Sequence, residues 1–140
     1  MPIAESEKII RTADLKARTK QFALRVMKLI DALPRTIQGR AIANQIIRSA
    51  TSVAANYRAA CRARSRAEFA AKIGIVEEEA DETLFWLELL EESELLPAAK
   101  LTAIKQEADE LIAITVTSIK TARRNRADNS ALRIPNSTLR

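Results

Sequence analysis

Apolar residues recur along most of this 140-residue chain at alternating spacings of three and four, which is the pattern of amphipathic helices that share one core. No stretch alternates apolar and polar residues for long enough to predict a strand. The positions predicted to face the core are Phe22, Val26, Leu29 and Leu33 in a first segment; Ile42, Ile46, Ser49, Val53, Asn56 and Ala60 in a second; Phe69, Ile73, Val76, Ala80, Thr83, Leu87 and Leu90 in a third; and Leu101, Ile104, Ala108, Leu111 and Thr115 in a fourth.

Helix-breaking and capping residues separate these segments. Pro34 and Pro97 interrupt the first and last junctions, and Ser65 with Glu68 forms a capping box that starts a new helix in the middle. Short connections favour antiparallel neighbours, so the pattern predicts an all-α, up-down-up-down four-helix bundle. The expected helices cover residues 13–33, 37–64, 66–93 and 97–124. Residues 1–124 then form the bundle domain, and the polar, aperiodic residues 125–140 are expected to form a flexible tail.

Two features of the pattern go beyond a plain bundle. Ser49 and Asn56 are polar at predicted core positions, and buried polar groups need partners and can fix the register or assembly state of packed helices. The third segment is apolar nearly all the way round at Phe85, Trp86 and Leu89, which is more than one core face buries. We therefore expect the subunits of a homo-oligomer to meet through these three residues.

Composition excludes several kinds of chemistry. The chain has no histidine, which rules out Ser-His-Asp and Cys-His catalysis and most zinc sites, and Cys61 has no second cysteine to pair with. Gly39 and Gly74 are too far apart to form a glycine-rich phosphate loop, and we interpret Gly74 as making room for Tyr57. The acidic run at residues 77–82 is interpreted as solvated or paired with arginine. We expect no catalytic residue, cofactor or metal.

The sequence also bears on the compartment. Its longest stretches without a charge are nine residues, about half of what a membrane span requires. The first residues lack a basic segment followed by an apolar run, the mark of a secretory signal. We expect a cytoplasmic protein without a membrane partner.

The charges are separated along the chain. Residues 40–66 hold six arginines and no acid, whereas residues 77–94 hold nine acids and no base. In an antiparallel hairpin these segments partly neutralise each other, with Arg48 expected near Glu78 or Glu82 and Arg40 near Glu88 or Glu91.

Three basic clusters carry the functional prediction. Residues 8–20, 58–72 and 120–126 each have a net charge of +4, and the predicted topology places them at the same end of the bundle. With three neighbouring acids that end sums to +9, which leaves −4 on the rest of a chain of net charge +5. Such an end suits phosphate contacts to RNA or DNA, while the alternative is a solvated basic end that only maintains solubility. The candidate nucleic-acid-binding residues are Lys16, Arg18, Lys20, Arg58, Arg62, Arg64, Arg66, Lys72, Lys120, Arg123 and Arg124.

Several motifs resemble a known family. Asp14-Leu15-Lys16, residues 47–57, residues 65–69, Lys72-Ile73-Gly74 and residues 78–87 are similar to the bacterial four-helix bundle proteins first noticed as reading frames inside intervening sequences of 23S ribosomal RNA. The resemblance implies a small bundle that assembles as a homopentamer, and it lends no catalytic residues. A related branch, the accessory variability protein of diversity-generating retroelements, suggests nucleic acid and a reverse transcriptase as partners.

These observations favour a non-enzymatic, oligomeric bundle that binds structured RNA or DNA through its basic end. The alternative is an interaction scaffold for a protein partner that uses the region of Phe85 and Trp86, or the tail, and does not bind nucleic acid.

Overall fold

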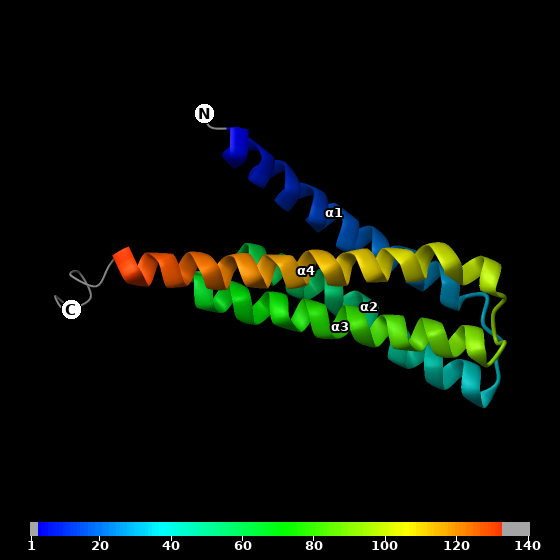
Figure 1. Ribbon diagram of the computed structural model, residues 1–140. Coiled ribbons are helices and arrows are strands. Elements are labelled where there is room, and N and C mark those ends of the chain that lie inside the picture. The colour runs from blue at the N-terminus through cyan, green and yellow to red at the C-terminus, as the bar shows by residue number, and fades with distance from the viewer. Residues whose placement is uncertain (1–2, 133–140) are drawn as a thin grey trace.

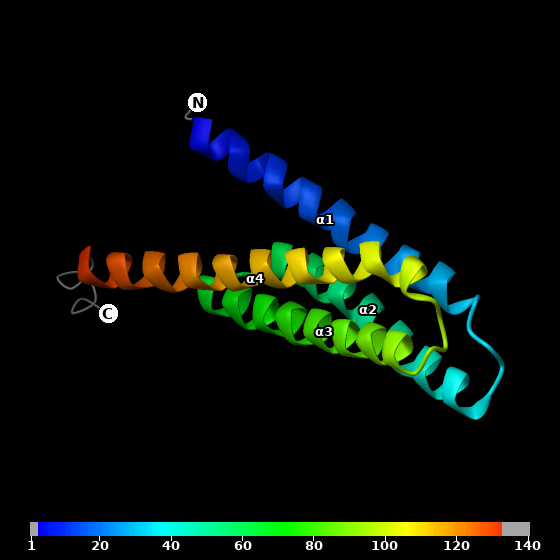
Figure 2. The same cartoon turned by 45° about the vertical axis from the view of Figure 1, so that its right-hand side comes forward.

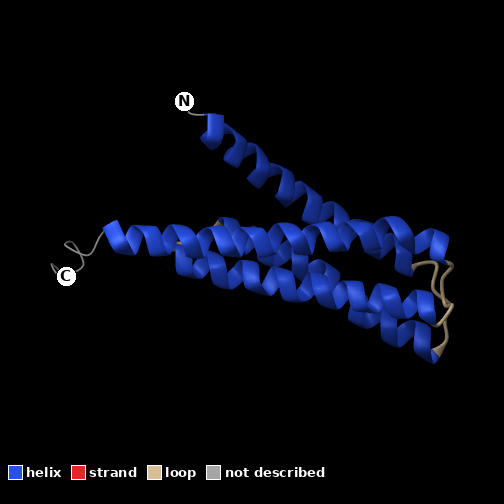
Figure 3. Cartoon of the chain, viewed as in Figure 1, coloured by secondary structure: helices blue, strands red, loops and turns tan. Residues whose placement is uncertain are grey.

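The computed structural model describes residues 3–132, with the side chains of residues 14–124. The chain forms four helices, α1 (Ile3–Ile30), α2 (Ile37–Cys61), α3 (Arg66–Glu92) and α4 (Ala98–Leu132), and residues 3–132 contain no strand (Figure 3). Consecutive helices run antiparallel (Figure 1). The connections α1–α2 and α3–α4 lie together at one end of the bundle, which we call the loop end, and the α2–α3 turn lies at the other. The predicted all-α arrangement of four helices is confirmed.

The first and last helices begin or end at other residues than predicted. α1 begins at Ile3 and ends at Ile30, where residues 13–33 were expected, and α4 continues to Leu132, past the expected end at residue 124. The boundary between bundle and tail therefore falls inside a helix, because no glycine or proline interrupts the chain between Pro97 and Pro135 and polar residues continue a helix without difficulty. Residues 133–140, the rest of the predicted tail, lie outside the described part of the chain.

Local hydrogen bonds explain where the inner helices begin. The Thr36 hydroxyl accepts a bond from the backbone N–H of Gly39 (3.1 Å), which caps α2. A Cβ at Gly39 would collide with the carbonyl oxygen of Pro34, so only glycine fits this turn. At the start of α3 the Ser65 hydroxyl accepts from the N–H of Glu68 (3.0 Å), and the Glu68 carboxylate accepts from the N–H of Arg64 (3.2 Å). The predicted capping box is confirmed, with the return bond one residue earlier than in the standard motif.

The core follows the predicted seams in α3 and α4. All five predicted positions of α4 are buried, and in α3 all are buried except Phe69, which is half-buried. In α2 all predicted positions are buried except Asn56, which is only half-buried. Its neighbour Tyr57 is buried instead, so the prediction that Asn56 faces the core is wrong. A spacing of 3.6 residues per turn carries the buried face onto Tyr57 at that point.

α1 is the least integrated helix. It packs against α2 and, over a shorter length, against α4, and it makes no contact with α3. Its loop-end half supplies Phe22 and Val26, both fully buried. Towards its N-terminus α1 diverges from the other three helices (Figures 1 and 2). The opposite end of the bundle is consequently built on α2, α3 and α4.

Candidate nucleic-acid interface

The α2–α3 turn and the C-terminal half of α4 come together at the end opposite the loops (Figure 1). We call the cations gathered there the basic end. They are Arg58, Arg62, Arg64, Arg66, Lys72, Lys120, Arg123 and Arg124. All of these side chains are exposed except that of Lys72, which is half-buried. The tertiary structure thus brings together eight of the eleven predicted residues from two separate parts of the sequence.

The ion pair of Arg64 in the α2–α3 turn is weak. Arg64 and Glu68 form an ion pair at the long distance of 4.0 Å, and 93% of the Arg64 side chain is exposed. A pair of this kind is screened by water and contributes little. The positive charge of Arg64 therefore remains directed at solvent.

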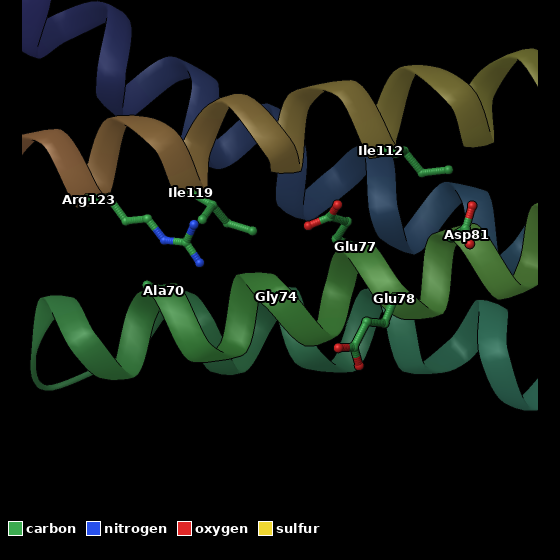
Figure 4. Close-up of a pocket in the computed structure, with 8 residues that line it drawn as sticks. All are labelled: Ala70, Gly74, Glu77, Glu78, Asp81, Ile112, Ile119 and Arg123. Carbon is green, nitrogen blue, oxygen red and sulfur yellow. The ribbon is translucent and has the colours of Figure 1, made fainter.

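Arg123 stands beside a cavity between α3 and α4. Figure 4 shows its side chain reaching from α4 towards α3, while Glu77 extends from α3 towards α4. The cavity has a volume of about 520 Å³. Its lining residues are Ala70, Gly74, Glu77, Glu78, Asp81, Ile112, Ile119 and Arg123. A Cβ at Gly74 would meet no atom within 4 Å, so our interpretation that Gly74 makes room for Tyr57 is wrong, and the glycine instead borders this open space.

The three predicted residues on α1 lie elsewhere. Arg18 is paired with α4: its Nη2 donates to Glu107 Oε1 (2.6 Å) and its Nε to Glu107 Oε2 (3.1 Å). This bidentate contact raises the pKa of Arg18, mainly through the bond to Glu107. Glu107 and Arg123 are 16 residues apart, or about 24 Å along the helix. Lys16 and Lys20 flank Arg18 on exposed positions, so the expectation that this group joins the basic end is wrong.

The reason is the position of α1 along the bundle. The prediction began this helix near residue 13, whereas α1 begins at Ile3. Residues 16–20 therefore lie in the middle of α1, and the helix has left its neighbours before it reaches the level of the basic end (Figure 2).

The acidic stretch of α3 is solvated or paired, without a cluster suited to a metal. Among the described side chains no group of three acids or thiols converges. Burial raises the pKa of Glu79, and the nearby charges of Glu82 and Glu78 raise it further, while Arg48 opposes them. Glu91 bonds Lys105 of α4 (2.9 Å). The Arg40 side chain donates to the Arg35 carbonyl (3.2 Å), and among the described residues no ion pair joins it to Glu88 or Glu91.

The family model of the 23S rRNA-intervening sequence protein matches residues 11–117. The chain belongs to this family. Among solved structures it is similar to a crystal structure of a protein of unknown function from the S23 ribosomal protein family of Bacteroides thetaiotaomicron. The two chains are 35% identical with a TM-score of 0.71, and the similarity covers 76% of this chain and 98% of the other. No curated protein matches.

Membership of the 23S rRNA-intervening sequence protein family covers the basic end only in part. The turn from Arg58 to Lys72 lies inside the matched residues. Lys120, Arg123 and Arg124 lie beyond residue 117, so the contribution of α4 is a feature of this chain outside the family match. No helix among the described residues is long and apolar enough to cross a membrane.

The three residues predicted to form the oligomer interface differ in their exposure. Phe85 and Leu89 are 54% and 36% exposed on the outer face of α3. Trp86 is half-buried against the core, its ring centroid is 4.9 Å from that of Phe85, and its buried Nε1 has no hydrogen-bond partner. Phe85 and Leu89 are therefore available to a partner, whereas Trp86 serves mainly the bundle itself.

Of the two predicted structural polar residues, only Ser49 connects helices. Ser49 is fully buried, and the Thr83 hydroxyl donates to its Oγ across the α2–α3 interface (2.7 Å). Each hydroxyl also lies near a carbonyl of its own helix, Ile46 for Ser49 and Glu79 for Thr83. Asn56 bonds the Ser52 carbonyl and hydroxyl one turn earlier and has no partner on another helix in the described hydrogen bonds. Ser49 and Thr83 thus suit a role in fixing register.

Sequence reasoning missed a second basic groove. A cavity of about 340 Å³ between α1 and α4 near the loop end is flanked by Arg25, Lys28 and Lys100. Arg25 and Lys28 share one face of α1 because they are three residues apart, but Lys100 joins them only through the fold.

Proposed function

We propose that this protein is a non-enzymatic bundle that binds nucleic acid, either structured RNA or DNA, through its basic end. The observation that supports the proposal is the gathering of eight cations from the α2–α3 turn and α4 at one end of the bundle. One of them, Arg64, forms only a weak ion pair with Glu68. Arginine and lysine at such an end contact phosphates and release the counterions that surround a nucleic acid.

The proposed contacts are to the backbone and not to the bases. Tyr57 is buried and Trp86 is half-buried, so neither ring offers a stacking platform at the basic end. Binding should therefore depend weakly on sequence and strongly on salt, with a loss of affinity that is linear in the logarithm of salt concentration.

A charge-reversal experiment tests this proposal. We expect Arg62→Glu with Arg124→Glu to weaken an electrophoretic mobility shift of a ribosomal RNA fragment by at least about tenfold, and to reduce the salt slope by about two. Both side chains are exposed, so the fold should tolerate the change. The matched control is Arg35→Glu with Arg40→Glu, two exposed cations at the loop end that line neither cavity. An equal loss in both variants, or a shift that persists unchanged at high salt, would contradict the proposal.

We also propose that the bundle assembles as a homo-oligomer, which the resemblance described above suggests is a pentamer. The exposure of Phe85 and Leu89 supports this part, because large apolar side chains on an outer helix face are typical of interfaces. Sedimentation of the full chain should give a mass several times that of one subunit, and a monomeric mass would overturn it.

The same exposed residues favour a second candidate, a scaffold for a protein partner. If the chain assembles but shifts neither structured RNA nor duplex DNA at low salt, the scaffold is the better description. The partner would then be sought by capture on the full chain, with Phe85→Ser as the variant expected to lose it.

A further inference from the structure

The outer face of α3 is apolar at its centre and acidic around it. Phe85 and Leu89, one turn apart, are exposed there. The acids around them are also exposed, and α3 carries no lysine or arginine after Lys72. These acids are Glu78, Asp81, Glu82, Glu88 and Glu92. We call this surface the acidic face of α3.

The outer face of α1 has the complementary composition. Leu24 and Met27 are 48% and 42% exposed. Lys16, Lys20 and Lys28 are exposed on the same helix. We call this surface, with its two apolar side chains among three lysines, the basic face of α1. Each face thus has two exposed apolar side chains, and the charges around them are opposite in sign.

The fold holds the two faces on opposite corners of the bundle. α1 contacts α2 and α4, α3 contacts the same two helices, and α1 and α3 do not touch. The faces also lie at the same level along the bundle. Arg25 and Leu29 of α1 share a cavity with Ala103 of α4, and Lys105, half a turn further along α4, bonds Glu91 of α3.

We infer that the acidic face of α3 docks onto the basic face of α1 in a second copy of this chain, with Phe85 and Leu89 packing on Leu24 and Met27. A symmetric contact would place acids against acids or lysines against lysines, which costs free energy, whereas the contact of unlike faces pairs them. Because the faces lie on opposite corners, the contact leaves one copy with a free basic face and the other with a free acidic face, and it repeats from copy to copy until a ring closes. This inference rests on the assembly part of the proposed function.

The contact has a consequence for the basic end. Since the two faces lie at one level, neighbouring copies stand side by side and point the same way. The basic ends of all copies then gather on one side of the ring, where a single nucleic acid is able to touch several of them.

Cross-linking distinguishes this contact from others. In a Cys61→Ser background, Leu24→Cys with Leu89→Cys should give a covalent ladder up to the full oligomer with a short bismaleimide. Neither cysteine alone should cross-link, because each would face an apolar residue of the other helix. The matched control replaces Leu89→Cys with Gln106→Cys, an exposed position on α4, and should give no ladder.

Charge exchange gives a second readout. Lys20→Glu with Lys28→Glu should weaken assembly by at least about tenfold in concentration, as should Glu88→Lys with Glu92→Lys. All four changes in one chain should restore it, since the pairs are re-formed with their signs exchanged.

The outcomes separate the inference from the proposals it rests on. Cross-linking of either single-cysteine variant, or an oligomer of the double variant that gives no ladder, overturns the α1–α3 contact and leaves the proposed assembly in place. A monomeric mass overturns both. The charge reversal at Arg62 and Arg124 tests the basic end separately, because neither side chain belongs to the two faces.

Discussion

The loop end and the basic end of this bundle are built differently. At the loop end α1 closes the core with Phe22 and Val26, and the α3–α4 connection adds Leu96 above the fully buried Leu101. At the basic end three helices supply the core, and a cavity of about 520 Å³ separates parts of α3 and α4. The loop end thus has the more complete core, with a smaller cavity of about 340 Å³ beside Arg25, Lys28 and Lys100, and the basic end has the larger cavity and more of the exposed cations. Burial of Phe22, Val26 and Leu101 at the loop end stabilises the fold, while the open space at the basic end leaves its arginines accessible to solvent.

The largest expected effect comes from replacing a leucine by alanine in each of two regions. Leu101→Ala at the loop end should lower the free energy of unfolding by about 3 kcal/mol, because it leaves a cavity in a closed core. Leu15→Ala, in the part of α1 that approaches its divergence, should cost less than about 1 kcal/mol because that side chain is only half-buried. Urea unfolding followed by circular dichroism measures both. Equal costs would contradict the weaker integration of α1 at that level.

The contact that ties α1 to α4 offers a smaller test. Arg18→Ala removes the bidentate bond to Glu107 and should cost about 1 kcal/mol, since the pair is partly shielded from water. Hydrogen exchange should rise in α1 and stay unchanged in α3. Glu110→Gln is the control, because its 3.5 Å contact to Arg18 is long and exposed. Faster exchange throughout the bundle would contradict a local role.

The end of α3 provides a stabilising change at the loop end. Glu94 has a φ of 60°, and the bonds from Leu95 N to Leu90 O (3.1 Å) and from Glu94 N to Glu91 O (3.0 Å) form a Schellman motif. Glycine is favoured at that position, so Glu94→Gly should raise the free energy of unfolding by about 1 kcal/mol. Glu94→Ala keeps the Cβ and should gain nothing by this route. A matching gain in alanine would assign the effect to charge.

The smallest expected effect depends on pH. Burial raises the pKa of Glu79, so the folded chain holds this proton to a higher pH than the unfolded chain. The stability that it contributes is complete below the ordinary glutamate pKa of about 4.3 and is lost as pH rises through the raised value. Glu79→Gln should therefore stabilise the protein by a few tenths of a kcal/mol at pH 7 and by nothing near pH 4. A loss of stability at pH 7 would show that the attraction of Arg48 exceeds the cost of burial.

Local patterns predicted much of this molecule. The seams of α3 and α4 follow from apolar spacing alone, and the capping box at Ser65 follows from two residues three apart. The turn from Arg58 to Lys72 is basic in any fold, since its charges are neighbours in the sequence.

Contacts between distant residues were beyond the same reasoning. Glu91 binds Lys105 in preference to an arginine of α2 because it lies on the α4 side of α3. The pairing of Arg18 with Glu107 depends on how far α1 slides and tilts against α4, which no local pattern records.

By itself, the sequence determined four helices, most of their buried faces and the sign of the charge in each segment, because these depend on residues within a few turns of one another. Only the tertiary structure decided which charges meet. In the folded chain Lys16, Arg18 and Lys20 lie away from the basic end, and Gly74 borders a cavity. The basic face of α1 and the acidic face of α3 lie on opposite corners of the bundle. The physical reason is that the axial position and tilt of a helix are fixed by packing summed over its whole length.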